Sequence, residues 1–283
     1  MSTKKQTWTT IIKPNRRIFD IPIREIWSYR DLLFLLVHRD FVSMYKQTIL
    51  GPLWFIIQPV LTTLVFTVIF GNIAKIPTDG LPPMLFYLAG LTCWAYFSEC
   101  LTKTSDTFIT NANVFGKVYF PRVIVPLSIV ASGLLKFFVQ FILFLCFLVY
   151  FTLVNDSIRP NEYMLLLPLL LLLMAGISLG AGMIISSLTT KYRDLRFLLS
   201  FAVQLLMYAT PIIYPISTLP EQYRIFILAN PITPVIETFR YAFLGNGTMD
   251  FYHLLYSFGF MLVLLTFAIV IFNQVEKNFM DTV

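Results

Sequence analysis

The sequence predicts an all-α integral membrane protein with six transmembrane helices, an N-terminal cytosolic interface helix and re-entrant outer half-helices between the fifth and sixth spans. Three observations support this fold class. Of the 283 residues, 57% are hydrophobic and only 13% are charged, whereas soluble domains carry roughly 25% charged residues. Several uncharged stretches are long enough to cross a bilayer core of about 30 Å. The lysines and arginines gather on one side of these stretches.

The chain is organised around residues 45–71. A polar segment at Tyr45 and Lys46 leads into Gly51 and Pro52, and the whole of 52–74 is free of charged residues. At about 1.5 Å per helical residue, such a run spans the bilayer core. Because proline is favoured in the first turn of a helix, this segment predicts a turn from the cytosol into the membrane.

The apolar stretches divide the chain into three regions. Residues 1–51 form a cytosolic segment that contains the interface helix, residues 52–273 form the membrane domain, and 274–283 form a cytosolic tail. The six spans are expected at about 52–74, 84–102, 123–154, 163–188, 197–215 and 250–273. The third span is longer than a perpendicular crossing needs, so we expect it to tilt or protrude.

Residues 30–46 predict a helix that is too short and too charged to span the membrane. Leu33, Val37, Phe41 and Met44 share one face of this helix, and the charged side chains lie mostly elsewhere. We therefore expect it to lie along the cytosolic surface of the bilayer.

Residues 216–249 predict two short half-helices that dip into the outer leaflet. The apolar pieces at 225–229 and 235–244 are too short to span, and proline and glycine break the segment. Such backbone is tolerated at membrane depth only where protein or a water-filled cavity covers it.

The positive charges predict the orientation. The side that holds both termini carries nine lysines and arginines in 1–51, three in 103–122, three in 189–196 and one in the tail. The other side carries four, which are Lys75, Arg159, Arg224 and Arg240. By the positive-inside rule both termini are cytosolic.

The sequence shows no pattern typical of catalysis or of a metal site in this chain. It contains no phosphate-binding GxxxxGK[ST] loop and no HExxH, and its carboxylates are dispersed. Cys93, Cys100 and Cys146 lie in apolar stretches and are expected to be small buried hydrophobic residues. The net charge of +6 is placed beside the spans, which favours membrane lipids over nucleic acid as its partner.

The inner loops 103–122 and 189–196 are the more informative feature. They are too polar for the membrane and too small to be domains, so they are either ordinary loops or docking elements for a cytosolic partner. Arg193, Asp194 and Arg196 could pair with charged groups of that partner, and such contacts tune specificity more than affinity.

Polar and aromatic residues inside the spans are candidates for a transport path. A charge within a span usually faces a partner or water, so Lys136 and Gln140, which share a face, could contact substrate or a second subunit. Snorkelling is the alternative for Lys136. Aromatic rings can stack on sugars, although each could equally face lipid or pack internally. The predicted path residues are Tyr87, Trp94, Tyr96, Lys136, Gln140, Gln204 and Tyr208.

Five motifs in order then suggest a family. They are Arg39-Asp40 through Tyr45-Lys-Gln-Thr-Ile-Leu-Gly-Pro-Leu-Trp54 with Gln58-Pro59, Lys117-Val-Tyr-Phe-Pro-Arg122 with Pro126, Tyr192-Arg-Asp194, Pro211-Ile-Ile-Tyr214, and Asn230-Pro-Ile-Thr-Pro234 through Glu237 and Arg240. With these motifs, almost the whole chain resembles the membrane (permease) subunit of bacterial type-2 class ABC exporters for lipid-linked polysaccharide, the O-antigen and teichoic-acid exporter family.

The resemblance implies a homodimer in the bacterial inner membrane, with two copies of a separate ATPase subunit. ATP and magnesium would bind to that ATPase, and this chain would hold no cofactor. Residues 104–118 would form the main coupling helix, with the interface helix and 189–196 as secondary contacts. Spans 1 and 5 of the two subunits would meet at the dimer interface and separate to open a path. The implied coupling residues are Thr104, Asp106, Asn111, Asn113, Phe115, Lys117, Tyr192, Arg193 and Asp194.

Two further sets of residues follow from the same resemblance. The lipid pyrophosphate would be received near the interface helix by Arg24, Arg30, Arg39 and Lys46. A contact with anionic membrane lipids is the alternative for each of them. The outer re-entrant region would be built around Asn230, Pro231, Glu237 and Arg240.

The expected function is therefore export of a lipid-linked polysaccharide, with O-antigen as the main expectation. Teichoic acid or capsular polysaccharide is the alternative substrate within the same family. A passive channel and an intramembrane glycosyl-transfer enzyme are more distant alternatives, because the chain lacks a filter-like loop and clustered carboxylates.

Overall fold

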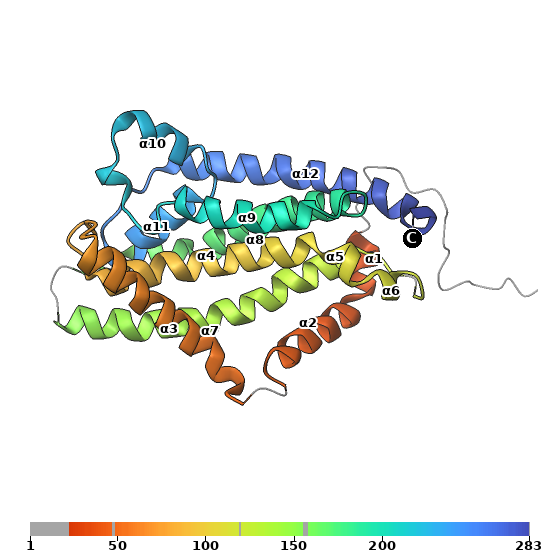
Figure 1. Ribbon diagram of the computed structural model, residues 1–283, viewed down its shortest axis with the longest axis horizontal. Coiled ribbons are helices and arrows are strands. Elements are labelled where there is room, and N and C mark those ends of the chain that lie inside the picture. The colour runs from red at the N-terminus through yellow and green to blue at the C-terminus, as the bar shows by residue number, and fades with distance from the viewer. Residues whose placement is uncertain (1–22, 47–48, 119, 155–157, 283) are drawn as a thin grey trace, which may run out of the picture.

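The computed structural model describes residues 23–46, 49–118, 120–154 and 158–282, and all regular elements in this part of the chain are helices (Figure 1). The elements of the inner end and first two spans are α1 (Ile23–Ser28), α2 (Arg30–Tyr45), η1 (Gly51–Leu53), α3 (Trp54–Phe66), η2 (Thr67–Ile73), α4 (Pro83–Ser105), α5 (Thr107–Thr110) and α6 (Ala112–Phe115). The remaining elements are α7 (Ile124–Val154), η3 (Glu162–Leu166), α8 (Leu167–Thr189), α9 (Leu195–Tyr208), η4 (Ile216–Thr218), α10 (Glu221–Leu228), α11 (Thr233–Leu244) and α12 (Phe251–Thr282). The predicted all-α membrane fold is confirmed.

Five helical segments are long and apolar enough to cross a membrane. They are Gly51–Ile73, Pro83–Ser105, Ile124–Val154, Glu162–Thr189 and Phe251–Val275, and they match five of the six predicted spans. The predicted span at 197–215 is wrong at its outer end, because α9 stops at Tyr208 after 14 residues. A helix of that length rises only about 21 Å, and Pro211 cannot continue it because proline lacks a backbone N–H.

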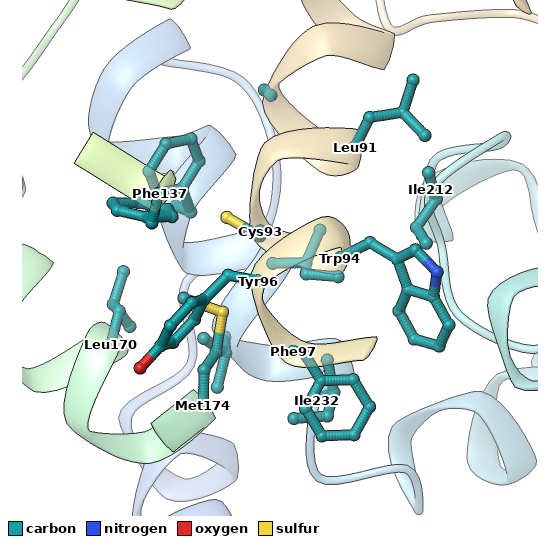
Figure 2. Packing of buried hydrophobic residues seen from close by; sticks show 14 of the residues in the cluster. Leu91, Cys93, Trp94, Tyr96, Phe97, Phe137, Leu170, Met174, Ile212 and Ile232 are labelled. Atoms are coloured by element: carbon teal, nitrogen blue, oxygen red, sulfur yellow. The ribbon is translucent and has the colours of Figure 1, made fainter. Parts of the chain in front are cut away.

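Helix α4 is the centre of the bundle. In its most apolar stretch 78% of the residues are buried, against 11–33% in the other four long segments. The outer helices therefore present apolar side chains outward, as expected where lipid or a second subunit replaces water. Figure 2 shows the core around α4, where Tyr96 points toward Leu170 and Met174 of α8 while Trp94 points toward Ile212.

Helix α8 approaches its neighbours closely through glycines. A Cβ added at Gly176 would lie 2.3 Å from the sulfur of Met261 in α12, and one added at Gly182 would lie 2.5 Å from the Cβ of Thr104 in α4. Small residues at helix crossings are how membrane helices gain contact area. The glycines thus hold α8 between α4 and α12.

We expect Gly182→Ala to destabilise the subunit by about 1–3 kcal/mol, because the added methyl group has no space between α4 and α8. Gly259→Ala in α12 is the matched control, since nothing lies within 4 Å of its added Cβ. The control should be neutral or up to about 1 kcal/mol more stable, because alanine is the better helix former. Thermal unfolding of both purified proteins in one detergent would compare them, and equal effects would contradict the tight crossing.

The interface helix and the half-helices also form where they were predicted. Helix α2 covers 30–45 and buries Leu36 beside α7, with Leu32 and Leu33 partly buried around it. Leu33, Val37 and Phe41 of the predicted face are partly buried, and the Met44 side chain lies outside the described part of the chain. Helices α10 and α11 are the two half-helices, and they lie at the end of the bundle opposite α5 and α6 (Figure 1).

Candidate functional site

The predicted coupling segment continues directly from the inner end of α4. Instead of one helix over 104–118, the structure has two single-turn helices, α5 and α6, which meet at Asn111. The Asn111 side-chain amide donates to the carbonyl of Thr107 at 3.0 Å, which closes the turn between them. Phe108 and Phe115 point into a small apolar cluster, where Phe108 stacks on Phe272 of α12 with ring centroids 4.7 Å apart.

The structure divides the predicted coupling residues into buried and exposed ones. Thr104 and Phe115 are buried and therefore hold the segment in place. Asp106 and Asn111 are only partly buried. The exposed ones, which a partner could reach, are Asn113, Lys117, Tyr192, Arg193 and Asp194.

A cleft of about 280 Å³ lies between the interface helix, the coupling segment and α7. Arg39 and Lys103 supply its cations, and hydroxyl and amide groups supply further donors. The lining residues are Arg39, Asp40, Ser43, Lys103, Asp106, Thr110, Asn111, Val125, Ile129 and Ser132. The cleft is therefore polar and mixed in charge, with room for a small anionic group.

Of the residues predicted to receive a lipid pyrophosphate, the structure brings only Arg39 to this cleft. Arg39 also donates to Asp40 at 2.7 Å. Arg30 is exposed and lies over the ring of Trp27 at 5.7 Å, and Lys46 is exposed beyond the end of α2. The Arg24 side chain lies outside the described part of the chain. Lys103 was not predicted for this role.

A charged cluster connects α4 to α7 inside the bundle. Glu99 accepts from Lys136 at 2.5 Å and from Lys103 at 2.8 Å, and the Glu99 and Lys136 side chains are each 20% exposed. The predicted candidate Lys136 thus has an internal partner, and Glu99, to which sequence reasoning assigned no function, holds two lysines. In the sequence, the spacing of Glu99 and Lys103, four residues apart on one helix, already indicated an ion pair.

The other predicted path residues fall into two groups. Tyr87, Trp94, Tyr96 and Gln140 are buried inside the subunit, at 0%, 6%, 3% and 5% exposure. Gln204 and Tyr208 are exposed, and they are one helical turn apart on α9. In this conformation only the α9 pair lies on an accessible surface.

The predicted outer residues come together as one unit. The fully buried Arg240 of α11 donates to the carbonyls of Pro211 and Ile212, the latter at 2.8 Å, and pairs with Glu237 at 3.3 Å. Its guanidinium lies 3.7 Å from the ring centre of Phe86 in α4. Arg240 therefore holds α11 to the chain that follows α9.

Two further contacts close this outer unit. The Asn230 side-chain amide donates to the hydroxyl of Thr210 at 2.9 Å. The carbonyl of Pro231 accepts from Ser257 of α12 at 2.8 Å. The end of α9, the half-helices and the start of α12 are thus tied together by polar contacts as well as by apolar burial.

The structure is a bundle of apolar helices with α2, α5 and α6 at one end and the two half-helices at the other (Figure 1), and comparison with known proteins shows its class. Residues 31–244 match the family described as ABC-2 type transporter, and the chain belongs to this family. The chain is 29% identical over 254 residues to the O-antigen export system permease protein RfbA of Klebsiella pneumoniae, covering 89% of this chain and 94% of that protein.

More distant similarities extend over the same length. Identity is 27% over 263 residues to RfbA of Myxococcus xanthus, covering 92% of this chain and 98% of that protein. It is 23% over 248 residues to the polysialic acid transport protein KpsM of Escherichia coli, covering 87% and 93%. The predicted family is confirmed, and the chain is an integral membrane permease.

Proposed function

We propose that this chain is the transmembrane subunit of an ATP-driven exporter. The exporter moves a lipid-linked polysaccharide from the cytosol across the bacterial inner membrane, and O-antigen is the substrate that we favour. The observation that carries the proposal is the full-length similarity to proteins named as O-antigen export permeases, which covers 89–92% of this chain. Capsular polysaccharide is the second candidate, because KpsM matches nearly the same share of the chain at lower identity.

In this proposal both termini are cytosolic and α9 is the fifth of six crossings. The excess of lysines and arginines on the loops beside α2, α5 and the start of α9 supports that orientation. Helix α1 and the end of α12 lie at the same end of the bundle (Figure 1), which requires an even number of crossings. Five long segments together with α9 satisfy this requirement.

The proposed transport cycle uses two copies of the permease and two copies of a separate ATPase, which binds ATP and magnesium. The ATPase contacts the exposed residues of 104–118 and 189–196. The lipid phosphates are received in the cleft beside α2, where Arg39 and Lys103 can donate to phosphate oxygens. Two α9 helices and two α3 helices face each other across the dimer, and their separation opens the path for the glycan.

The proposal is tested by purifying the tagged permease from its native membrane and assaying what accompanies it. An ATP-hydrolysing subunit in equal amount is the expected result. Deleting the permease gene should then remove one surface polysaccharide and leave its lipid-linked form inside the cell. A solitary protein without an ATPase would overturn the exporter, and accumulation of capsule in place of O-antigen would select the second candidate.

Arg193→Glu should weaken ATPase association about tenfold, equivalent to 1.4 kcal/mol. Arg193 is exposed on the loop between α8 and α9, and reversal of a charge at an interface rim introduces repulsion without unfolding the spans. Arg159→Glu is the matched control, because Arg159 is exposed near the opposite end of the bundle. The measure is the ratio of ATPase to permease after co-purification, and an unchanged ratio would remove Arg193 from the docking surface.

A further inference from the structure

We infer that the ion pair between Asp106 and Arg196 links the ATPase-contacting segment to helix α9, and that this link transmits the force of ATP-driven closure to the transport path. The inference rests on the proposed function and adds to it a specific pair of positioning residues. Asp106 lies at the junction of α4 and α5, and Arg196 lies in the first turn of α9. Their side chains approach at 2.9 Å.

The inner ends of α4, α5 and α8 form one block. The backbone N–H of Phe108 donates to the hydroxyl of Ser186 at 3.2 Å, and the hydroxyl of Thr189 donates to the carbonyl of Ser105 at 3.3 Å. Thr104 is fully buried beside Gly182. A push on α5 therefore moves the inner ends of α4 and α8 together.

Within the subunit, α9 is packed much less tightly than this block. Leu199 is the one buried residue of α9 among the described side chains. Elsewhere α9 exposes large apolar side chains, among them Phe197, Phe201 and Leu205. The Asp106–Arg196 pair joins α9 to the junction of α4 and α5. Other side-chain bonds of the described α9 residues are local, since Ser200 donates to the carbonyl of Arg196 and the hydroxyl of Tyr214 donates to the carbonyl of Tyr208.

This pair is suited to transmit motion more than to hold the fold. The Arg196 side chain is 52% exposed and that of Asp106 is 16% exposed, so water screens the pair on the Arg196 side and reduces its contribution to stability. Asp106 makes no side-chain capping bond to α5, so its replacement removes no helix cap. A force on α5 acts directly at Asp106, and through Arg196 it turns the inner end of α9.

The test measures ATP hydrolysis and glycan export on the same reconstituted complex. Asp106→Asn and Arg196→Gln should each lower export per ATP by roughly twofold to fivefold, the range of an exposed ion pair, while the ATPase still co-purifies. The exchange of both charges, Asp106→Arg with Arg196→Asp, should restore most of the ratio of glycan exported to ATP hydrolysed. Arg159→Gln, which removes an exposed cation near the other end of the bundle, should leave the ratio unchanged.

A second measurement needs only the purified permease. Breaking the pair should speed amide hydrogen exchange in 197–201, at the start of α9, and the charge exchange should slow it again. Unchanged export per ATP in both single variants, or a charge exchange that restores neither the ratio nor the protection, would overturn the link. If no ATPase accompanies the unaltered permease, the proposed function fails, and hydrogen exchange still decides whether the pair holds α9.

Discussion

Replacing Arg240 by methionine should produce the largest loss of stability in the outer half of the subunit. The Arg240 and Glu237 side chains are 1% and 4% exposed, so the change leaves a buried carboxylate without its cation. It also removes the donors to the carbonyls of Pro211 and Ile212. Removing one partner of a buried ion pair costs about 3–5 kcal/mol, and for a chain of this size that lowers the melting temperature on the order of 10 °C.

The double variant Arg240→Met with Glu237→Met separates two contributions to the loss of stability. One is the unpaired Glu237 carboxylate, and the other is the loss of hydrogen bonds to the two carbonyls. The double variant should recover part of the stability, because the unpaired carboxylate is gone while the two carbonyls remain without donors. Arg159→Met, at an exposed cation, should have little effect. Thermal unfolding of the four proteins in one detergent provides the comparison. A single variant as stable as the unaltered protein would show that Arg240 does not clamp α11.

The position of the spans could be predicted because the bilayer restricts what a chain can do. A long uncharged segment has to satisfy its backbone internally, so it forms a helix whatever its neighbours are. The half-helices were predictable for a related reason, since prolines break the apolar run at 216–249. The clear error among the spans is the outer end of the fifth, where Pro211 and Pro215 were already visible in the sequence. The residues around both prolines remain hydrophobic, but proline cannot donate the backbone hydrogen bond that a helix requires. The predicted burial of Cys146 is also wrong, because its side chain is exposed.

The direction of each side chain was much harder to predict than the spans. Residues 83–97 of α4 carry no charge, so periodicity could not tell that Tyr87, Trp94 and Tyr96 face the interior of the subunit. The glycines of α8 did carry a signal, because Gly176 and Gly180 are four residues apart and small residues at that spacing mark helix crossings. Only the fold, however, could identify Met261 and Leu264 as the side chains opposite them.

The functional pairs were hidden because each joins residues far apart in the chain. Glu99 and Lys136 are 37 residues apart, and neither position alone indicates the other. Asp106 and Arg196 were both noticed as charged loop residues, yet their contact depends on how α4 and α9 end. The predicted outer residues Asn230, Pro231, Glu237 and Arg240 lie close together because one short segment carries all four.

Replacing Glu99 by glutamine should be the most damaging single change in the inner half of the bundle. Glu99 holds Lys136 at 2.5 Å and Lys103 at 2.8 Å, so its neutralisation leaves two lysines without a counter-ion. Lys103, at 44% exposure, can turn toward water, whereas Lys136, at 20%, remains inside the bundle. An unpaired charge there costs about 3 kcal/mol on insertion scales, and we expect a comparable loss of stability with reduced yield of folded permease.

The reverse change, Lys136→Leu, should be milder, because Glu99 keeps Lys103 as a partner. The double variant Glu99→Gln with Lys136→Leu should be more stable than Glu99→Gln alone, since no unpaired charge remains deep in the bundle. Yield by size-exclusion chromatography, melting temperature and glycan export are measured on all three. If Lys136→Leu abolishes export while its folding stays near normal, Lys136 contacts the substrate as the sequence predicted. If export falls in proportion to stability in every variant, the charged cluster serves to hold α4 against α7. The transport path then lies elsewhere, and the exposed Gln204 and Tyr208 on α9 are the remaining candidates for it.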